Sequence, residues 1–262
     1  MSLAAARDSS KLRPMFRTSN PVLNDSSFHR AIPAIGEGTM TLTGTALKTL
    51  FLTALLVMSA SYTWNSISTS APPAWLSPAL KFGWIIPLGI AAVIAFFPRL
   101  AGLLSPVYAV TKGAIVGIIS YMFEAQFEGI VLTSVLLTAG VLSALLTAYV
   151  TGIIKPSQNF RLGIFAATGG VCIYYLLAWV LGMWGIELPG IHGNGWFSIG
   201  FSAFVVILAA LNLVLDFDFI ENGCASGAPK HMEWYGAFGL LVTLVWLYIE
   251  ILRLLAKLRS RD

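Results

Sequence analysis

The stretch ALNLVLDFDFIENG, residues 210–223, joins an apolar run to three carboxylates, Asp216, Asp218 and Glu221. The run closes an apolar segment at about 197–219, and roughly 20 such residues are enough to cross a membrane as a helix. Charged side chains in a membrane are costly, so those that occur there are candidates for function. The stretch therefore indicates both a membrane fold and a place to look for its chemistry.

The composition of the whole chain favours lipid as its surroundings. The 262 residues are 57% hydrophobic and only 11% charged, with a mean hydropathy of +0.80, whereas soluble domains carry about a quarter charged residues. The two cysteines, Cys172 and Cys224, are far apart and form neither a metal-binding spacing nor a disulfide framework. The net charge of +4 is concentrated at the chain ends. Aromatic residues are not interleaved with these basic residues. We therefore expect the basic residues to orient the chain in the membrane, and we expect no nucleic-acid partner.

Two parts of the chain differ in character. Residues 1–40 are polar and contain several prolines, which predicts a largely disordered N-terminal tail. Residues 41–262 hold seven apolar segments long enough to span a membrane, and they predict a single all-α, polytopic membrane domain. The segments lie at about 45–64, 82–98, 102–122, 129–151, 162–184, 197–219 and 235–257.

The basic residues predict a cytoplasmic N-terminus, because loops on the cytoplasmic side are enriched in lysine and arginine. With this orientation Lys81 is the only basic residue in the outer loops. One conflict remains, since seven spans place the C-terminus outside although its last ten residues are basic. A re-entrant segment with an inner C-terminus is therefore the alternative. The inner face receives Arg7, Lys11, Arg13, Arg17, Arg30, Lys48, Arg99, Lys155, Arg161 and Lys230.

The last two segments contain three acids inside or at the edge of the membrane: Asp216, Asp218 and Glu250. Glu250, in VWLYIEILRLL, has apolar neighbours on both sides. Two carboxylates a few ångströms apart cannot both ionise easily, so a pair of them shares one proton. Without that proton the pair could bind Ca²⁺, which prefers carboxylate and carbonyl oxygens. We predict Asp216 and Glu250 as this pH-sensing and cation-binding pair, because Asp216 lies deeper than Asp218.

Simpler interpretations of the same charges stay open. Asp218 fits an acid at the inner membrane surface. Glu250 could pair with Arg253 three residues later, although we expect Arg253 and Lys257 to extend toward the membrane surface. Lys112 lies in the middle of the third segment, where it needs a counter-charge or a path to water. It is either part of a charge lock or a lysine on a cavity wall without a function.

Motifs for catalysis are missing from the sequence. There is no HExxH, no P-loop and no GxSxG motif, and the intramembrane aspartates lack the Gly-x-Gly-Asp context of membrane aspartyl proteases. We therefore expect no enzyme activity and no cofactor. Lys230, His231 and Glu233 are expected in the loop before the last helix, where the histidine would be solvated.

Several motifs, in their order, resemble the Bax inhibitor-1-like family and in particular its bacterial members. The family pattern has an acid closing the sixth helix and a last helix with a central acid and a basic tail. Here the matching stretches are DFDFIENG and LYIEILRLLAKLRSR, together with RLAGLLSPVYAVTKGAIVGIIS on the third segment and FRTSNPVLN and MTLTGTALKT near the start. The resemblance covers the chain from about residue 16. It implies a seven-helix bundle with the last helix at its centre.

The resemblance also implies a function. Family members are described as pH-sensitive calcium leak channels, here of the bacterial inner membrane, with Ca²⁺ as the transported ion. Their sensor acids fall on Asp216 and Glu250, and a lock arginine falls on Arg99. Some bacterial relatives are thought to restrain a membrane-bound AAA protease, so a non-transporting regulator is the alternative, and a proton-coupled transporter is a third class.

The sequence departs from the family pattern in three ways. The second acid is Glu instead of Asp, and the second segment has no acid. Asp216 and Glu250 are 34 positions apart, which is more than the pattern implies. The two acids would be level only if the last helix entered the membrane near residues 240–241 and not at Tyr235.

Overall fold

The computed structural model describes residues 38–68, 83–185, 193 and 195–261. Of the tail expected at 1–40, positions 1–37 lie outside the described residues. Within the described part the elements are helices. They are α2 (Leu42–Ser68), α4 (Ile85–Phe96), the short 3₁₀ helix η2 (Pro98–Leu100), α5 (Ala101–Gln126), α6 (Ile130–Val150), α7 (Gln158–Gly182), α8 (Trp196–Ala225) and α9 (Met232–Arg259).

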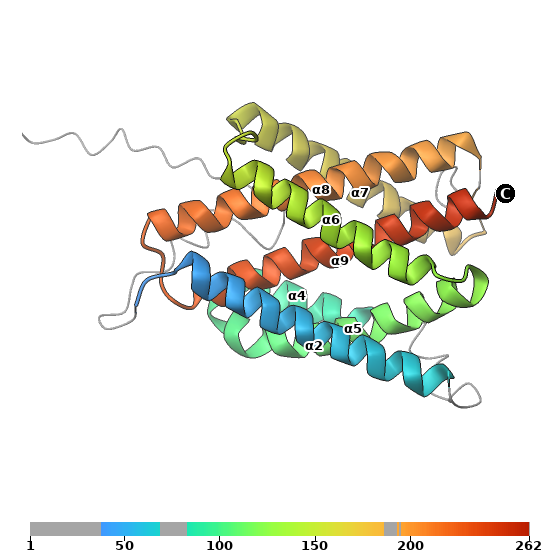
Figure 1. The fold of residues 1–262 in the computed structure, drawn as a ribbon, viewed down its shortest axis with the longest axis horizontal. Helices are drawn as coiled ribbons and strands as arrows, with labels where there is room; N and C mark the ends of the chain where they lie inside the picture. The colour runs from blue at the N-terminus through green and yellow to red at the C-terminus, as the bar shows by residue number, and fades with distance from the viewer. Residues whose placement is uncertain (1–37, 69–82, 186–192, 194, 262) are drawn as a thin grey trace, which may run out of the picture.

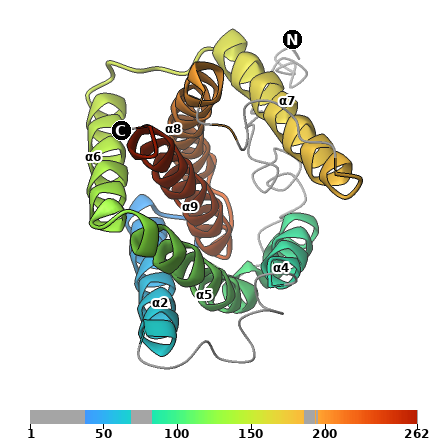
Figure 2. The same cartoon turned by 90° about the vertical axis from the view of Figure 1, so that its right-hand side faces the viewer.

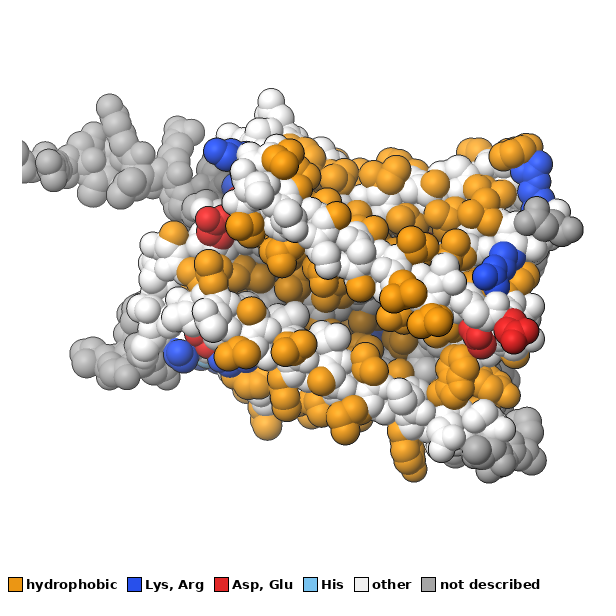
Figure 3. All heavy atoms as spheres, in the orientation of Figure 1, with side chains coloured by type: hydrophobic (Ala, Val, Ile, Leu, Met, Phe, Trp, Pro, Cys, Tyr) orange, Lys and Arg blue, Asp and Glu red, His pale blue; other side chains and the backbone are white. Residues whose placement is uncertain are grey.

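Six of the described helices are long and apolar enough to cross a membrane by length and composition. The remaining apolar helix, α4, has 12 residues and is shorter than the segment 82–98 predicted. It ends at Phe96 because a residue that precedes a proline is disfavoured in the α conformation, and Phe97, before Pro98, has φ −128° and ψ 74°. The charged side chains gather at the two ends of the bundle, and the face between them is largely apolar (Figure 3).

Helix α9 runs through the middle of the bundle, as the family resemblance implies. Looking along the bundle, α2, α5, α6, α7 and α8 surround it (Figure 2), and α9 packs directly on α8, α2, α6 and α5. Large side chains such as Tyr235, Phe238 and Leu252 are fully buried on it. The all-α, polytopic bundle with the last helix central is therefore confirmed.

Two glycines allow α5 to approach α2 closely. A Cβ atom added at Gly113 would lie 2.4 Å from the Leu56 carbonyl oxygen, and one at Gly117 would lie 2.4 Å from the Ala60 carbonyl oxygen. Small residues four apart let helix backbones pack this closely in membranes, where dispersion contacts drive helix association. This contact fixes α5, and with it Lys112, against the rest of the bundle.

The start of α2 is attached to the turn between α8 and α9. Thr39 forms an isolated antiparallel bridge with Pro229, and the Met40 N–H donates to the Ala228 carbonyl at 2.7 Å. The end of α9 lies at the opposite end of the bundle (Figure 1). The two ends of the described chain therefore lie at opposite ends of the bundle, which is the arrangement that an odd number of crossings requires.

Candidate functional site

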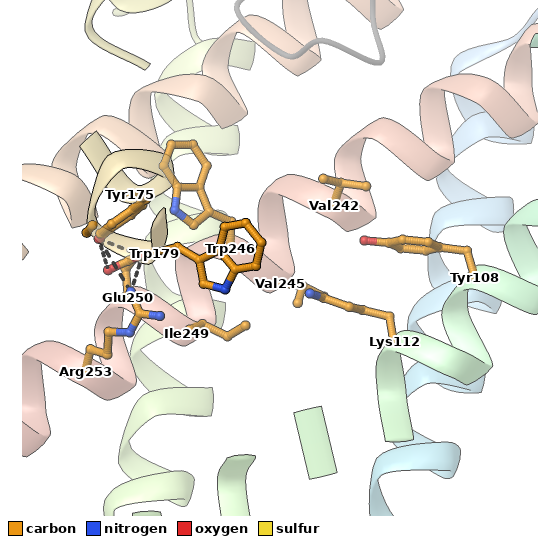
Figure 4. A pocket seen from close by; sticks show the side chains of 11 residues that line it. Tyr108, Lys112, Tyr175, Trp179, Val242, Val245, Trp246, Ile249, Glu250 and Arg253 are labelled. Atoms are coloured by element: carbon orange, nitrogen blue, oxygen red, sulfur yellow. Dashed lines mark hydrogen bonds and ion pairs between the residues drawn. The ribbon is translucent and has the colours of Figure 1, made fainter. Parts of the chain in front are cut away.

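Glu250 lies on the inward face of α9, and its carboxylate contacts one residue of its own helix and one residue of α7. Its side chain is 3% exposed and forms an ion pair with Arg253 at 3.2 Å. The Tyr175 hydroxyl lies 3.3 Å from both carboxylate oxygens, and the Arg253 guanidinium also lies over the Tyr175 ring (Figure 4). The Arg253 pairing that the sequence left open is thus present, and the Arg253 side chain also remains 40% exposed.

Asp216 is fully buried on α8, but the structure does not bring it to Glu250, whose described partners are Tyr175 and Arg253. The physical reason is the start of α9 at Met232, directly after a short turn. Asp216 lies nine residues before the end of α8 and Glu250 eighteen residues after the start of α9. At 1.5 Å per residue the two acids are about 13 Å apart along the bundle. The expected proton-sharing pair, and a Ca²⁺ site made of both acids, are therefore not formed.

Asp218 and Glu221 bind partners near the end of α8. Asp218 forms an ion pair with Arg161 of α7 at 2.8 Å, with both side chains mostly buried. Glu221 accepts a hydrogen bond from the Tyr149 hydroxyl of α6. These contacts tie α6 and α7 to α8 near the turn that precedes α9. Asp218 thus lies near the helix end, as the interpretation of an acid near the membrane surface expects.

The two residues considered for a charge lock differ in position. Arg99 lies in η2 and is exposed, and the described residues offer it no ion pair, so it does not lock either buried acid here. Lys112 lies in the middle of α5. It lines the same cavity as Glu250, with a volume of about 540 Å³, between α5, α7 and α9. Figure 4 shows both side chains at this cavity.

Sequence reasoning missed a third buried acid, Glu233. It lies in the first turn of α9 and not in a loop, and it is fully buried. Its carboxylate forms an ion pair with Lys48 of α2 and accepts hydrogen bonds from the Thr41 N–H at 3.0 Å and hydroxyl at 2.8 Å. Lys230 lies 3.4 Å away. The available signal was Lys48, a cation inside an apolar segment that requires a partner.

Lys257 was also expected at the membrane surface but is buried. Its ammonium donates to the Ser202 hydroxyl at 2.8 Å and contacts the Ser198 carbonyl oxygen at 3.4 Å. Both partners lie in the first turns of α8, next to the end of α9. Lys257 therefore joins the end of α9 to the start of α8, while Glu233 joins the start of α9 to α2.

A comparison with known families agrees with this architecture. The family described as Bax inhibitor 1 like matches residues 20–260, which is nearly the whole chain. The chain belongs to the Bax inhibitor 1-like family. No curated protein and no solved structure matched it. The family match and the apolar helices together make it a multi-pass membrane protein.

In this Bax inhibitor 1-like protein, three buried carboxylates follow one another along the α8–α9 hairpin. Glu233 lies near the turn, Asp216 further into the bundle, and Glu250 further still. From the helical rise, successive acids are about 12 to 14 Å apart along the bundle. Within the described chain no group of three or more His, Cys, Asp or Glu side chains could hold a metal ion. The arrangement is a series of single acids and not a cluster.

Proposed function

We propose that this protein is a passive, proton-sensitive path for cations in the bacterial inner membrane, with Ca²⁺ as the expected ion and the N-terminus in the cytoplasm. The observation that carries the proposal is the burial of Asp216 and Glu250 on the central hairpin. A carboxylate in a membrane interior is costly, and fully buried acids at two depths offer a cation successive oxygen ligands. Protonation removes the charge of each acid and with it the attraction for a cation.

In this proposal the contacts of Glu250 keep the path closed. Arg253 and Tyr175 already bind the Glu250 carboxylate. A passing cation would therefore have to displace the Arg253 guanidinium. A cation that arrives at the cavity also meets Lys112, which repels it. We therefore expect slow flux that rises with pH, because ionised acids attract cations and protonated acids do not.

The test is Ca²⁺ flux into liposomes that contain the purified protein and an internal calcium dye. Glu250→Gln and Asp216→Asn should each lower the flux and flatten its pH dependence. Glu128→Gln is the matched control, because Glu128 is an exposed acid outside the hairpin. If both buried-acid variants keep the wild-type flux at every pH, the proposal is wrong. Accumulation of an ion or solute against its gradient would instead favour a proton-coupled transporter.

The second candidate function is a non-transporting regulator that binds a membrane AAA protease. The attachment of residues 39–40 to the α8–α9 turn favours it, because a partner that holds the N-terminal tail would act directly on the central hairpin. Removing the residues before Gly38 separates the two functions. A leak path keeps its flux after truncation, whereas a tail-dependent regulator loses its partner in co-purification from membranes.

A further inference from the structure

The cavity beside α9 carries more positive than negative charge. Its lining includes two cations, Lys112 and Arg253, and one acid, Glu250. Glu250 is already bound by Arg253 at 3.2 Å and by Tyr175. No described residue forms an ion pair or hydrogen bond with the Lys112 ammonium. One positive charge of the cavity therefore has no protein counter-charge among the described residues.

Lys112 lies where such a charge is expensive. It is eleven residues from the start of α5 and fourteen from its end, so it lies midway along a helix that is long enough to cross the membrane. A lysine at this depth requires a counter-charge or water. Figure 4 shows its side chain directed into the cavity, toward Val245 and the indole rings. An anion inside the cavity would supply the missing charge.

The other residues that line the cavity favour an anion whose uncharged part is apolar or aromatic. Trp179 and Trp246 come from α7 and α9, and Val242, Val245 and Ile249 add an aliphatic wall. A volume of about 540 Å³ is within the usual range for small-molecule sites, which are mostly apolar with a few placed polar groups. Inorganic anions would lose their hydration against these walls. A carboxylate with an aromatic body would place its charge at Lys112 and its ring against the indoles.

We propose that this cavity is a binding site for a small organic anion with an apolar or aromatic body, and that Lys112 is the residue that binds its charge. The proposal does not depend on cation flux. A bound anion would balance the excess positive charge of the cavity. A ligand of this class is therefore also suited to control the access of cations to Glu250.

The test is equilibrium binding of radiolabelled benzoate to the full-length protein in phosphatidylcholine nanodiscs, measured by scintillation proximity. Wild-type protein should bind benzoate saturably. Lys112→Met keeps the length of the side chain but removes its charge, and it should weaken binding by about tenfold or more, as expected for the loss of a hydrogen bond to a charged group. Lys112→Arg should retain binding. Lys155→Met is the control, because Lys155 is exposed and outside the cavity, and it should bind as the wild type does.

A second measurement needs no variant and so does not depend on folding. Benzamide has the shape of benzoate without its charge, and it should displace benzoate at least about tenfold less well. Equal displacement by benzamide, or unchanged binding by Lys112→Met, would overturn the proposal. The absence of saturable benzoate binding in the wild type would overturn it too. Loss of benzoate binding when phosphatidylglycerol is added to the nanodiscs would assign the site to a lipid and also contradict it.

Discussion

Glu250 and Glu233 differ in how the cost of burying their charge is met. Glu250 is neutralised by Arg253 on the same helix, whereas Glu233 is neutralised by Lys48 on another helix and also bonds Thr41 at the start of that helix. A carboxylate near the N-terminus of a helix is further stabilised by the helix dipole. Glu233 therefore holds two helices together, while the Glu250–Arg253 pair lies within one helix and Glu250 reaches α7 through the Tyr175 hydroxyl.

The contacts of Glu233 predict a large loss of stability when its charge is removed. Glu233→Gln leaves Lys48, whose side chain is 20% exposed, without its carboxylate, and removing one partner of a buried ion pair costs about 3 kcal/mol or more. Thermal unfolding in detergent measures the effect. The exposed acid variant Glu128→Gln should unfold as the wild type does. A Glu233→Gln protein as stable as this control would show that the Lys48 pair contributes no net stability.

The sequence predicted the candidate acids better than their partners. Asp216 and Glu250 stood out because apolar residues surround them, and both are indeed buried. Their pairing was wrong because it depended on where α9 begins, and hydropathy does not fix that point. By hydropathy, residues 232–241 could be part of the membrane-spanning helix or a segment on the membrane surface. Only the packed turn at 226–231 shows that the helix starts at Met232.

At the scale of elements, close packing of α2 on α5 positions the wall of the cavity. Gly113 and Gly117 face α2 with no room for a Cβ atom, so the distance between the helices depends on them. The seven apolar segments were predictable because each one is a continuous hydrophobic run. The shortness of α4 was missed because hydropathy does not register it, whereas the position of Phe97 before Pro98 does indicate where the helix ends.

The α2–α5 contact predicts opposite effects for two glycine substitutions. Gly117→Ala places a methyl group 2.4 Å from the Ala60 carbonyl oxygen, and such overpacking costs about 1 to 3 kcal/mol. Gly140→Ala on α6 meets nothing within 4 Å, and it should be neutral or raise stability by up to about 1 kcal/mol, because alanine favours helix. Thermal unfolding of both variants side by side is the measurement. Equal stability of the two would contradict the close contact.

At the scale of the molecule, the two ends of the described chain lie on opposite sides of the bundle (Figure 1). The basic C-terminal residues are held there by local contacts: Arg259 donates to the Glu128 carbonyl at 2.5 Å, and Arg261 lies 3.6 Å from the centre of the Trp196 ring. In the proposed orientation this end faces away from the cytoplasm, and these contacts would hold the basic residues there against their general preference for the cytoplasmic side.

The arrangement predicts opposite labelling of two exposed sites. In a background without Cys172 and Cys224, a cysteine at Ser260 should react with a membrane-impermeant maleimide added to intact spheroplasts. A cysteine at Lys155, at the other end of the bundle, should react only after the membrane is opened. Labelling of both positions from the same side would show that the chain crosses the membrane an even number of times between them.

The central claim is that Asp216 and Glu250 act at separate depths along one path. The most direct test is Ca²⁺ flux across a pH series for Asp216→Asn, Glu250→Gln and the double variant. Sites about 13 Å apart without shared partners should be nearly additive, so the logarithmic flux losses of the single variants should sum in the double variant. A double variant that loses no more flux than one single variant would show that the two acids work as one coupled pair, and it would contradict this account.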